Sequence, residues 1–389
     1  MNNSVRDLIV QTIKDLNESN PYLIIEPLYI QKICKTIKEN NPEIVEYCNM
    51  HINDILKSIQ MERSSNTYEY CKEDDPSKET IINYLQNIEQ PEQRTPEWYN
   101  FRYNHLTASN AWKSFGTQAS KNELIFEKCQ PMLIEKYAPS LTETPMSWGH
   151  KYEPLTVKLY EHLHNTKISD FGCIEHKSYP FLAASPDGIV TGDTNYGRMI
   201  EIKNVVSREI NGIPKKDYYI QMQLQMEVCD LDECDFVETK FTEYDYEEIY
   251  LQDVSESIHP IKKGVMCVFI RDNTSFHYEY MPFDYNGTYN QWIEEIKYNK
   301  SSDNLFWFRN IFWKLEVYSC VLVKRKKNWF NHAIQELESI WRTICDERIS
   351  GEYTKRSPKK RETKLKVIKL DEDAKKNDLE ALFDFVNET

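Results

Sequence analysis

The chain has 389 residues, of which 40% are hydrophobic and 28% charged, and its formal net charge is −14 at pH 7. This length suits more than one domain with a well-buried core, and only 10 glycines argue against a low-complexity protein. The negative charge excludes a uniformly basic nucleic-acid binder. It leaves room for a local basic groove, because charge interactions are screened over about 10 Å.

The cysteine pattern and hydropathy point to an intracellular protein. The 10 cysteines are scattered without a CxxC pair, which argues against a zinc ribbon or a disulfide scaffold and favours a reducing compartment. No run of about 18 apolar residues is present, so neither a membrane span nor a membrane partner is expected. The first residues also lack the apolar segment of a secretory signal.

The first part of the chain is expected to be accessory to a larger core. Residues 1–65 predict a helical accessory domain, because apolar residues recur at spacings of three and four. Residues 66–90 are largely polar and predict a linker. The composition changes at Pro91, where an aromatic and arginine-rich segment begins, and a helix is predicted over 121–136.

The middle of the chain alternates between helical and strand patterns. A helix is predicted to start at Pro154, because proline suits the first helical position, and another covers 217–229. Strands are predicted at 171–176, 181–185, 188–190, 198–204, 265–270 and 276–281, the last two as a hairpin. This order predicts an α/β fold in which a mixed central β-sheet is flanked by helices, over 91–300.

Two further regions are expected after this core. Residues 301–349 predict a tryptophan-rich extension with a strand at 318–323 and a helix at 328–346. Residues 350–389 lose periodicity and predict a disordered tail, basic at first and then acidic.

A set of charged residues in the middle of the chain is a candidate for catalysis. Glu153 precedes a predicted helix, Asp187 lies in a predicted turn, and Glu201 and Lys203 share one face of a strand, because strand side chains alternate. Such a charged pair on an apolar strand is costly to bury without a partner. Hydrolysis of a phosphodiester needs a deprotonated water, neutralised phosphate charge and a stabilised leaving oxygen.

The carboxylates also suit a metal site. Hard oxygen ligands such as Glu153, Asp187 and Glu201, with the Ile202 carbonyl, select Mg²⁺ or Mn²⁺, as one or two ions. Lys203 would then orient the nucleophile and stabilise developing negative charge.

The motifs together resemble a known family. Ser185-Pro186-Asp187-Gly188 followed by Glu201-Ile202-Lys203 is similar to the PD-(D/E)XK nuclease signature, and the chain more narrowly resembles YqaJ-type viral recombinases, relatives of phage lambda exonuclease. Four more motifs agree over about 94–295, namely Trp98 to Arg102 with Leu106 to Ser109, Trp148 to Pro154, Ser207-Arg208, and Tyr218 to Met226.

The resemblance implies a restriction-endonuclease-like core and roles for individual residues. Glu153, Asp187 and Glu201 would be metal ligands, Lys203 the catalytic lysine, and Gln221 a support for the metal site or the nucleophile. A pocket for a 5′-terminal phosphate would be formed by Arg102, Ser109, Ser185 and Arg208.

The implied activity is that of a metal-dependent DNA exonuclease, 5′→3′ on linear duplex DNA, whose 3′ single strands would feed recombination or repair through a single-strand annealing protein. Two alternatives remain open: an endonuclease of the same fold, and a DNA-end-binding or host-interaction protein with secondary nuclease activity. A homo-oligomer, a trimer in the lambda-like relatives, is implied by resemblance alone.

The resemblance and the composition also bear on where the protein acts. Frequent Asn, Ile, Lys and Tyr, together with the resemblance, suggest a large DNA virus, so the site of action is expected in the nucleus or a cytoplasmic replication site. Lys359, Lys360 and Arg361 are candidate contacts for DNA or for nuclear import, and a solvated tail explains them equally well.

Overall fold

The structure is a computed structural model that describes residues 77–132, 145–255, 263–271, 275–303 and 305–358, besides residues 11, 35–37 and 39. Lys359, Lys360 and Arg361 lie outside the described residues, as does the predicted helical domain at 1–65 except for those few positions. No helix in the described ranges is both long enough and apolar enough to cross a membrane.

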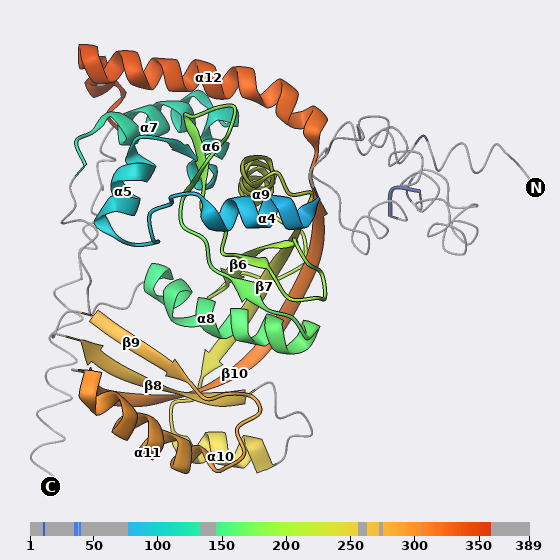
Figure 1. The fold of residues 1–389 in the computed structure, drawn as a ribbon, viewed down its shortest axis with the longest axis vertical. Helices are drawn as coiled ribbons and strands as arrows, with labels where there is room; N and C mark the ends of the chain where they lie inside the picture. The colour runs from blue at the N-terminus through green and yellow to red at the C-terminus, as the bar shows by residue number, and fades with distance from the viewer. Residues whose placement is uncertain are drawn as a thin grey trace, which may run out of the picture.

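The described core is built on a curved, mixed sheet, seen in Figure 1. Its order is β2 (Ile168–Ser169), β5 (Gly188–Val190), β6 (Met199–Asn204), β7 (Glu233–Glu243), β10 (Leu305–Lys324), β8 (Lys263–Arg271) and β9 (Ser275–Tyr280). The β6–β7 pair is parallel, whereas the other pairs are antiparallel. A smaller sheet has the order β1 (Leu106–Thr107), β4 (Leu182–Ala184) and β3 (Ile174–Glu175).

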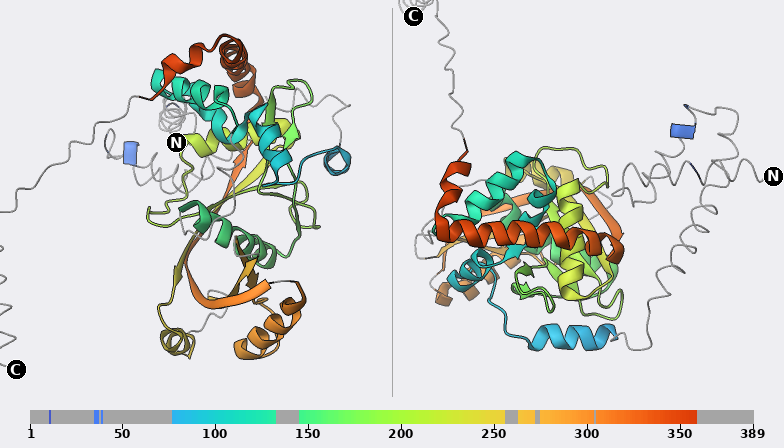
Figure 2. Two further views of the ribbon diagram at one scale, coloured as in Figure 1. Left: turned by 90° about the vertical axis from the view of Figure 1, so that its left-hand side faces the viewer. Right: turned by 90° about the horizontal axis from the view of Figure 1, so that it is seen from above.

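Helices cover both ends of this sheet, as Figures 1 and 2 show. One group consists of α4 (Lys78–Asn87), α5 (Pro96–Tyr103), α6 (Ala108–Ala111), α7 (Gln118–Cys129), α9 (Lys216–Cys229) and α12 (Lys327–Ser350). At the opposite end lie α10 (Glu247–Ser255) and α11 (Tyr289–Lys300), and α8 (Pro145–His164) packs beside β6. Short 3-10 helices cover Trp112–Phe115, Ser301–Asp303 and Glu352–Arg356.

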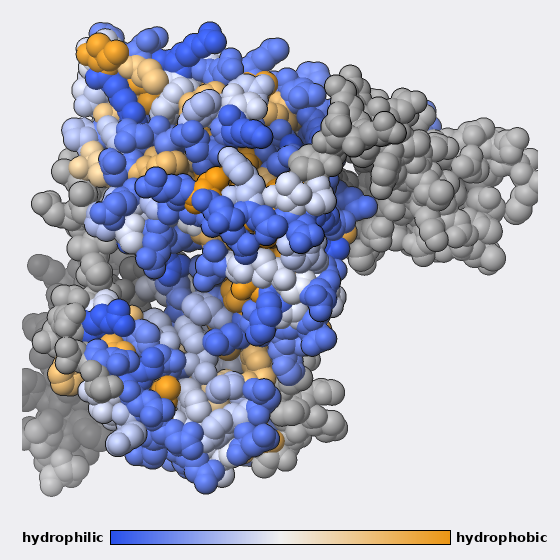
Figure 3. All heavy atoms as spheres, viewed as in Figure 1, coloured by the Kyte–Doolittle hydropathy of each residue, from blue (hydrophilic) through white to orange (hydrophobic). Residues whose placement is uncertain are grey.

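The largest apolar cluster surrounds α9, which is buried on nearly all sides. The helix carries the buried residues Ile220, Met222, Leu224 and Met226, and it contacts α6, α12 and strands β3 and β4 of the small sheet. A helix that is apolar on most sides belongs in the interior of a domain. Polar side chains dominate the surface shown in Figure 3, where apolar ones are scattered. The α/β class, with a mixed sheet flanked by helices, is therefore confirmed.

Three features differ from the elements that the sequence predicts. Helix α8 begins at Pro145, so Pro154 lies inside it and the predicted start there is wrong. Proline lacks an N–H, so the His150 carbonyl loses its intrahelical donor from position 154. Strand β7 is not predicted, because Glu233, Asp235, Glu238 and Lys240 interrupt its apolar residues. Strand β10 is 20 residues long, with register shifts at Trp307/Arg309 and Leu315/Val317 that break its pattern.

Elements also fall in segments that are predicted to be linker, extension and tail. Helix α4 buries Ile82 and Leu85 within 66–90, and β10 lies between β7 and β8 inside the central sheet. Residues 352–356 form a 3-10 helix after Gly351, whose φ of 75° ends α12, and Arg356 pairs with Glu347. The disorder predicted from residue 350 therefore does not apply to 351–358. The division into domains itself stays a prediction.

Candidate active site

A cavity of about 550 Å³, which we call the acidic cavity, lies between the first half of α8 and the end of β6. Its lining includes Glu153 from α8, Asp187 from the turn before β5, and Ile202 and Lys203 from β6. The parts of the chain that supply these groups are separated in sequence but meet because α8 packs directly on β6, which pairs with β5. The structure thus brings together the acidic and basic residues that the sequence singles out.

Asp187 is held by the strand beside it. The Ile202 N–H donates to Asp187 Oδ2 at 2.7 Å, which fixes this carboxylate against β6. Gly188 follows it at a point of close approach, where an added Cβ would come within 2.4 Å of Ile168 Cγ2. The glycine of the Ser-Pro-Asp-Gly turn is therefore required by packing, and this packing keeps Asp187 next to β6.

Glu201 is fully buried and both its carboxylate oxygens are engaged. Lys203 Nζ donates to Oε1, and Gln225 Nε2 of α9 donates to Oε2 at 2.8 Å. The same Gln225 amide also donates to the Ser185 carbonyl at 3.3 Å, so it links β6, which carries Glu201, to the turn that carries Asp187. A buried carboxylate with a cation and an amide as partners avoids the cost of an unpaired charge.

The three acidic groups act on one another electrostatically. Burial first, and then the neighbouring charge of Glu201, raise the pKa of Asp187 well above its usual value. Burial also raises the pKa of Glu153, against the opposing effect of Arg94. Burial disfavours the Lys203 ammonium, but Glu201 and Asp187 outweigh it and raise the pKa of Lys203. Adding a positive charge to this cavity would favour both ionised carboxylates.

The donor set fits a hard divalent cation in chemistry, since it combines carboxylates and a backbone carbonyl. The mutual repulsion of Glu153, Asp187 and Glu201 is what a bound cation would relieve. Within the described ranges, however, no three Asp, Glu, His or Cys side chains already converge as a formed metal cluster. Arg94 pairs with Glu153 and Lys203 pairs with Glu201, so protein cations neutralise these carboxylates in this arrangement.

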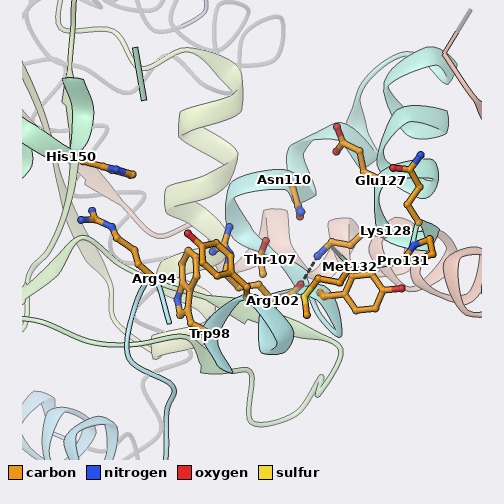
Figure 4. Close-up of a pocket in the computed structure, with 13 residues that line it drawn as sticks. Arg94, Trp98, Arg102, Thr107, Asn110, Glu127, Lys128, Pro131, Met132 and His150 are labelled. Carbon is orange, nitrogen blue, oxygen red and sulfur yellow. Dashed lines mark hydrogen bonds between the residues drawn. The ribbon is translucent and has the colours of Figure 1, made fainter. Parts of the chain in front are cut away.

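Figure 4 shows a second cavity, of about 500 Å³, which we call the basic cavity. It shares His150 with the first cavity. Arg94, Trp98, Arg102 and Lys128 are among its lining residues. Arg102 Nη2 donates to Ser109 Oγ at 2.8 Å, and its guanidinium lies 4.2 Å from the centroid of the Trp98 ring. The Trp98 Nε1–H donates to Ser185 Oγ at 3.0 Å. Arg102 thus contacts Ser109 directly, and Trp98 lies between Arg102 and Ser185 and contacts both.

Arg208 does not join this group. It lies after β6, lines the first cavity beside Lys203, and pairs with the buried carboxylate of Glu238 on β7. The reason is the parallel β6–β7 register, which sets Lys203 opposite Glu238 and brings the segment after β6 to the same carboxylate. In this structure Arg208 lines the acidic cavity and Arg102 the other one, and a phosphate pocket formed by all four residues stays a prediction.

The predicted role of Gln221 stays a prediction, because a neighbouring glutamine contacts Glu201 in this structure. Gln225, one helical turn further along α9, makes the hydrogen bond with Glu201, and Gln221 is not among the side chains that contact this carboxylate. Residues four apart share a helix face, so the repeated glutamines of α9 offer two candidates that sequence spacing cannot separate.

Other residues at the two cavities were not singled out from sequence. Arg94 Nη2 lies 3.0 Å from Glu153 Oε1, and burial, followed by Arg94, lowers the pKa of His150. Lys128 Nζ donates to the carbonyls of Arg102 and His105 at 2.5 and 2.6 Å. Of these residues only His150 could have been found from sequence, because it lies inside the Trp148 to Pro154 motif.

Comparison with known proteins finds a family model that matches part of the chain. Residues 97–232 match the model of the YqaJ-like viral recombinase domain. This segment includes the motifs from Trp98 to Met226, so the resemblance predicted from those motifs is confirmed there. The chain is also 28% identical over 351 residues to the uncharacterized protein R354 of Acanthamoeba polyphaga mimivirus, covering 80% of this chain and 61% of that relative. The chain therefore spans less than two thirds of this relative.

Solved structures give weaker matches. The alkaline exonuclease LHK-Exo from Laribacter hongkongensis is 21% identical with a TM-score of 0.38, over 67% of this chain and 97% of that one. The same protein in complex with dAMP is 20% identical with a TM-score of 0.39, over 67% of this chain and 98% of that one. A phage-related exonuclease from Haemophilus somnus 129PT is 14% identical with a TM-score of 0.35, over 64% of this chain and 96% of that one.

Proposed function

We propose, from the match of residues 97–232 to the YqaJ-like viral recombinase domain, that the chain is a metal-dependent nuclease that digests linear double-stranded DNA from its 5′ ends. The observation that carries this proposal is the cavity where Glu153, Asp187 and Lys203 meet the Ile202 backbone, next to a second cavity with Arg102. An acidic centre beside a basic one suits a strand whose end is held while a nearby phosphodiester is cut.

The acidic cavity would hold one or two Mg²⁺ or Mn²⁺ ions, with Glu153, Asp187, Glu201 and the Ile202 carbonyl as ligands. When bound, such an ion supplies a water of lowered pKa and positive charge for the phosphoryl oxygens. Lys203 would orient the attacking water and stabilise negative charge as it develops on the phosphate. Gln225 would keep Glu201 in place, a role that the resemblance alone would give to Gln221.

The basic cavity would hold the 5′-terminal phosphate. Arg102 and Ser109 already contact each other, and Ser185 lies within reach through Trp98. A guanidinium offers parallel N–H donors to a phosphate, and the neighbouring hydroxyls add further donors. The annealing-protein partner, the oligomeric state and the nuclear or cytoplasmic site of action stay predictions from the resemblance.

The test is digestion of one linear duplex that is labelled at its 5′ or 3′ ends, with and without a 5′ phosphate, in Mg²⁺. The wild type should release label first from phosphorylated 5′ ends, leave a covalently closed circle intact and lose activity in EDTA. Lys203→Met should abolish cleavage, whereas Lys158→Met, at an exposed lysine of α8, should not. Cutting of the closed circle would favour the endonuclease instead. Digestion by Lys203→Met at the wild-type rate would refute the assigned site.

A further inference from the structure

Arg94 adopts a backbone conformation that arginine rarely takes. Its φ is 68°, in the left-handed region, and the other non-glycine residues with positive φ in the described ranges are Asn165, Asn195 and Asp230. Asparagine and aspartate tolerate this region because their short polar side chains bond locally, whereas an arginine gains nothing of this kind. Strained residues of this sort concentrate at functional sites.

The residues on either side of Arg94 fix this conformation. Gln93 Nε2 donates to the carbonyls of Phe171 at 2.8 Å and of Pro186 at 3.2 Å, so it ties the segment to the turn that carries Asp187. On the other side, Thr95 Oγ1 donates to the Glu92 carbonyl at 2.7 Å and accepts from the Trp98 N–H as the cap of α5. The backbone at position 94 is therefore held between two anchors.

The result is an arginine that stands where the two cavities meet. Its guanidinium pairs with Glu153 of the acidic cavity, with Nη2 3.0 Å from Oε1, and both side chains stay partly exposed. Arg94 also lines the basic cavity, and Figure 4 shows it beside Trp98 and facing His150, which borders both cavities. A cation in this place can reach a carboxylate on one side and a bound strand on the other.

We propose that Arg94 is an exchangeable counter-ion that couples the filling of the acidic cavity to the binding of DNA. In the metal-free protein it neutralises Glu153. When a divalent cation takes over this carboxylate, the guanidinium is released to bind a backbone phosphate of the strand that runs between the cavities. The proposal rests on the proposed function, because it assumes a cation at Glu153 and a DNA strand across both cavities.

Charge balance supports this exchange. A divalent ion bound to Glu153 would repel the Arg94 guanidinium that shares this carboxylate, and this repulsion weakens the pair between Arg94 and Glu153. A guanidinium that loses a carboxylate partner finds in a phosphate an acceptor of matching geometry. The anchored backbone keeps the Cα of Arg94 in place, so the guanidinium can move from Glu153 to a phosphate by a change in the side-chain torsions alone.

The test uses two substitutions that suit the left-handed backbone and remove the charge, Arg94→Gly and Arg94→Asn. Asn195→Gly, at another positive-φ position, is the control for backbone effects. Mn²⁺ binding is titrated by calorimetry without DNA, and the binding of a fluorescent 5′-phosphorylated duplex is measured by anisotropy in Ca²⁺. Thermal unfolding verifies that each variant is folded.

Both Arg94 variants should bind Mn²⁺ about tenfold more tightly than the wild type and the duplex about tenfold more weakly, while Asn195→Gly changes neither. Unchanged or weaker Mn²⁺ binding, or unchanged duplex binding, in the folded variants would overturn the inference. Asp187→Asn separates the two levels of the argument. Suppose that the wild type digests DNA and binds Mn²⁺, and that Asp187→Asn loses Mn²⁺ binding. A failed result with the Arg94 variants then refutes the Arg94 exchange alone. If the wild type neither binds Mn²⁺ nor cleaves DNA, the proposed function fails together with the exchange.

Discussion

At the scale of one residue, burial changes the protonation of Lys128, which lines the basic cavity. The side chain is only 7% exposed, and its Nζ donates to the carbonyls of Arg102, at the end of α5, and of His105, just after it. A neutral amine has two hydrogens for these two acceptors. Burial first, and then Arg102 and Arg348, lower the pKa of Lys128 from 10.5 to about 7. The lysine thus holds the turn that positions Arg102, and it does so partly uncharged near neutral pH.

This lowered pKa predicts a pH dependence of stability. Between pH 7 and 10.5 the unfolded chain keeps the proton that folded Lys128 releases, so this residue makes the free energy of unfolding rise with pH in that window. Below pH 7 the amine is charged in both states and this gain is absent. In Lys128→Met the contribution disappears, so the stability gap between wild type and variant should widen by up to about 1.4 kcal/mol per pH unit.

The measurement is urea unfolding of both proteins at pH 7, 8 and 9, with Lys158→Met as the control at an exposed lysine. The loss of the two Lys128 hydrogen bonds lowers the stability of Lys128→Met by an amount that does not vary with pH, so the slope isolates the titration. A gap that stays constant from pH 7 to 9 would contradict the lowered pKa.

At the scale of an element, α9 joins the core to the acidic cavity. Its Gln225 amide spans Glu201 and the Ser185 carbonyl, while Gln223 Nε2 donates to the Lys324 carbonyl at the end of β10 at 2.9 Å. The Gln223 Oε1 also accepts from the Lys326 N–H at 2.7 Å. One helix therefore fixes the carboxylate of β6 and the turn between β10 and α12, two places far apart in the chain.

Gln225→Ala should lower both cleavage and stability, whereas Gln221→Ala should leave both close to wild type. Removing the Gln225 amide leaves one oxygen of a buried carboxylate without its donor, which costs roughly 1–3 kcal/mol. Because the two positions lie on the same helix, the change in helix propensity from Gln to Ala is matched between the variants. Chemical unfolding and initial cleavage rates in Mg²⁺ provide the comparison. A larger loss in Gln221→Ala than in Gln225→Ala would restore the role that the motif suggests for Gln221.

At the scale of the whole molecule, the two cavities separate basic residues that the sequence groups together. Arg102 lies with Ser109 at the basic cavity, while Arg208 lies with Lys203 at the acidic one. A duplex end would contact both at once, with its terminal phosphate at one and the bond to be cut at the other. Preference for a phosphorylated end should therefore depend on the basic cavity with Arg102 and not on the acidic cavity with Arg208.

Arg102→Ala should reduce the preference for 5′-phosphorylated over 5′-hydroxyl ends by roughly tenfold, because a charged hydrogen-bond donor to the terminal phosphate is lost. Arg208→Ala should slow digestion of both ends alike. The readout is the ratio of initial rates on the two substrates at concentrations below saturation, which a loss of folded protein does not alter. An unchanged ratio in Arg102→Ala, or an altered one in Arg208→Ala, would argue against this division.

The sequence by itself determined the α/β class and the order of most elements. It also identified Glu153, Asp187, Glu201 and Lys203, which carry charge or local turn signals in short motifs. Alternation along β6 put Glu201 and Lys203 on one face, and the structure shows their side chains in contact. Such signals are local in the chain, so they can be read without knowing what packs against them.

Only the tertiary structure decided which residues share a cavity. Parallel pairing with β7 moved Arg208 to Glu238, the rotation of α9 selected Gln225, and the fold placed Arg94 between Glu153 and Arg102. Strand β7 and the first half of β10 carry too many charges and register shifts to be found from periodicity. Each of these depends on contacts between segments distant in sequence, and the energy of such contacts comes from burial and pairing that no single stretch of the chain contains.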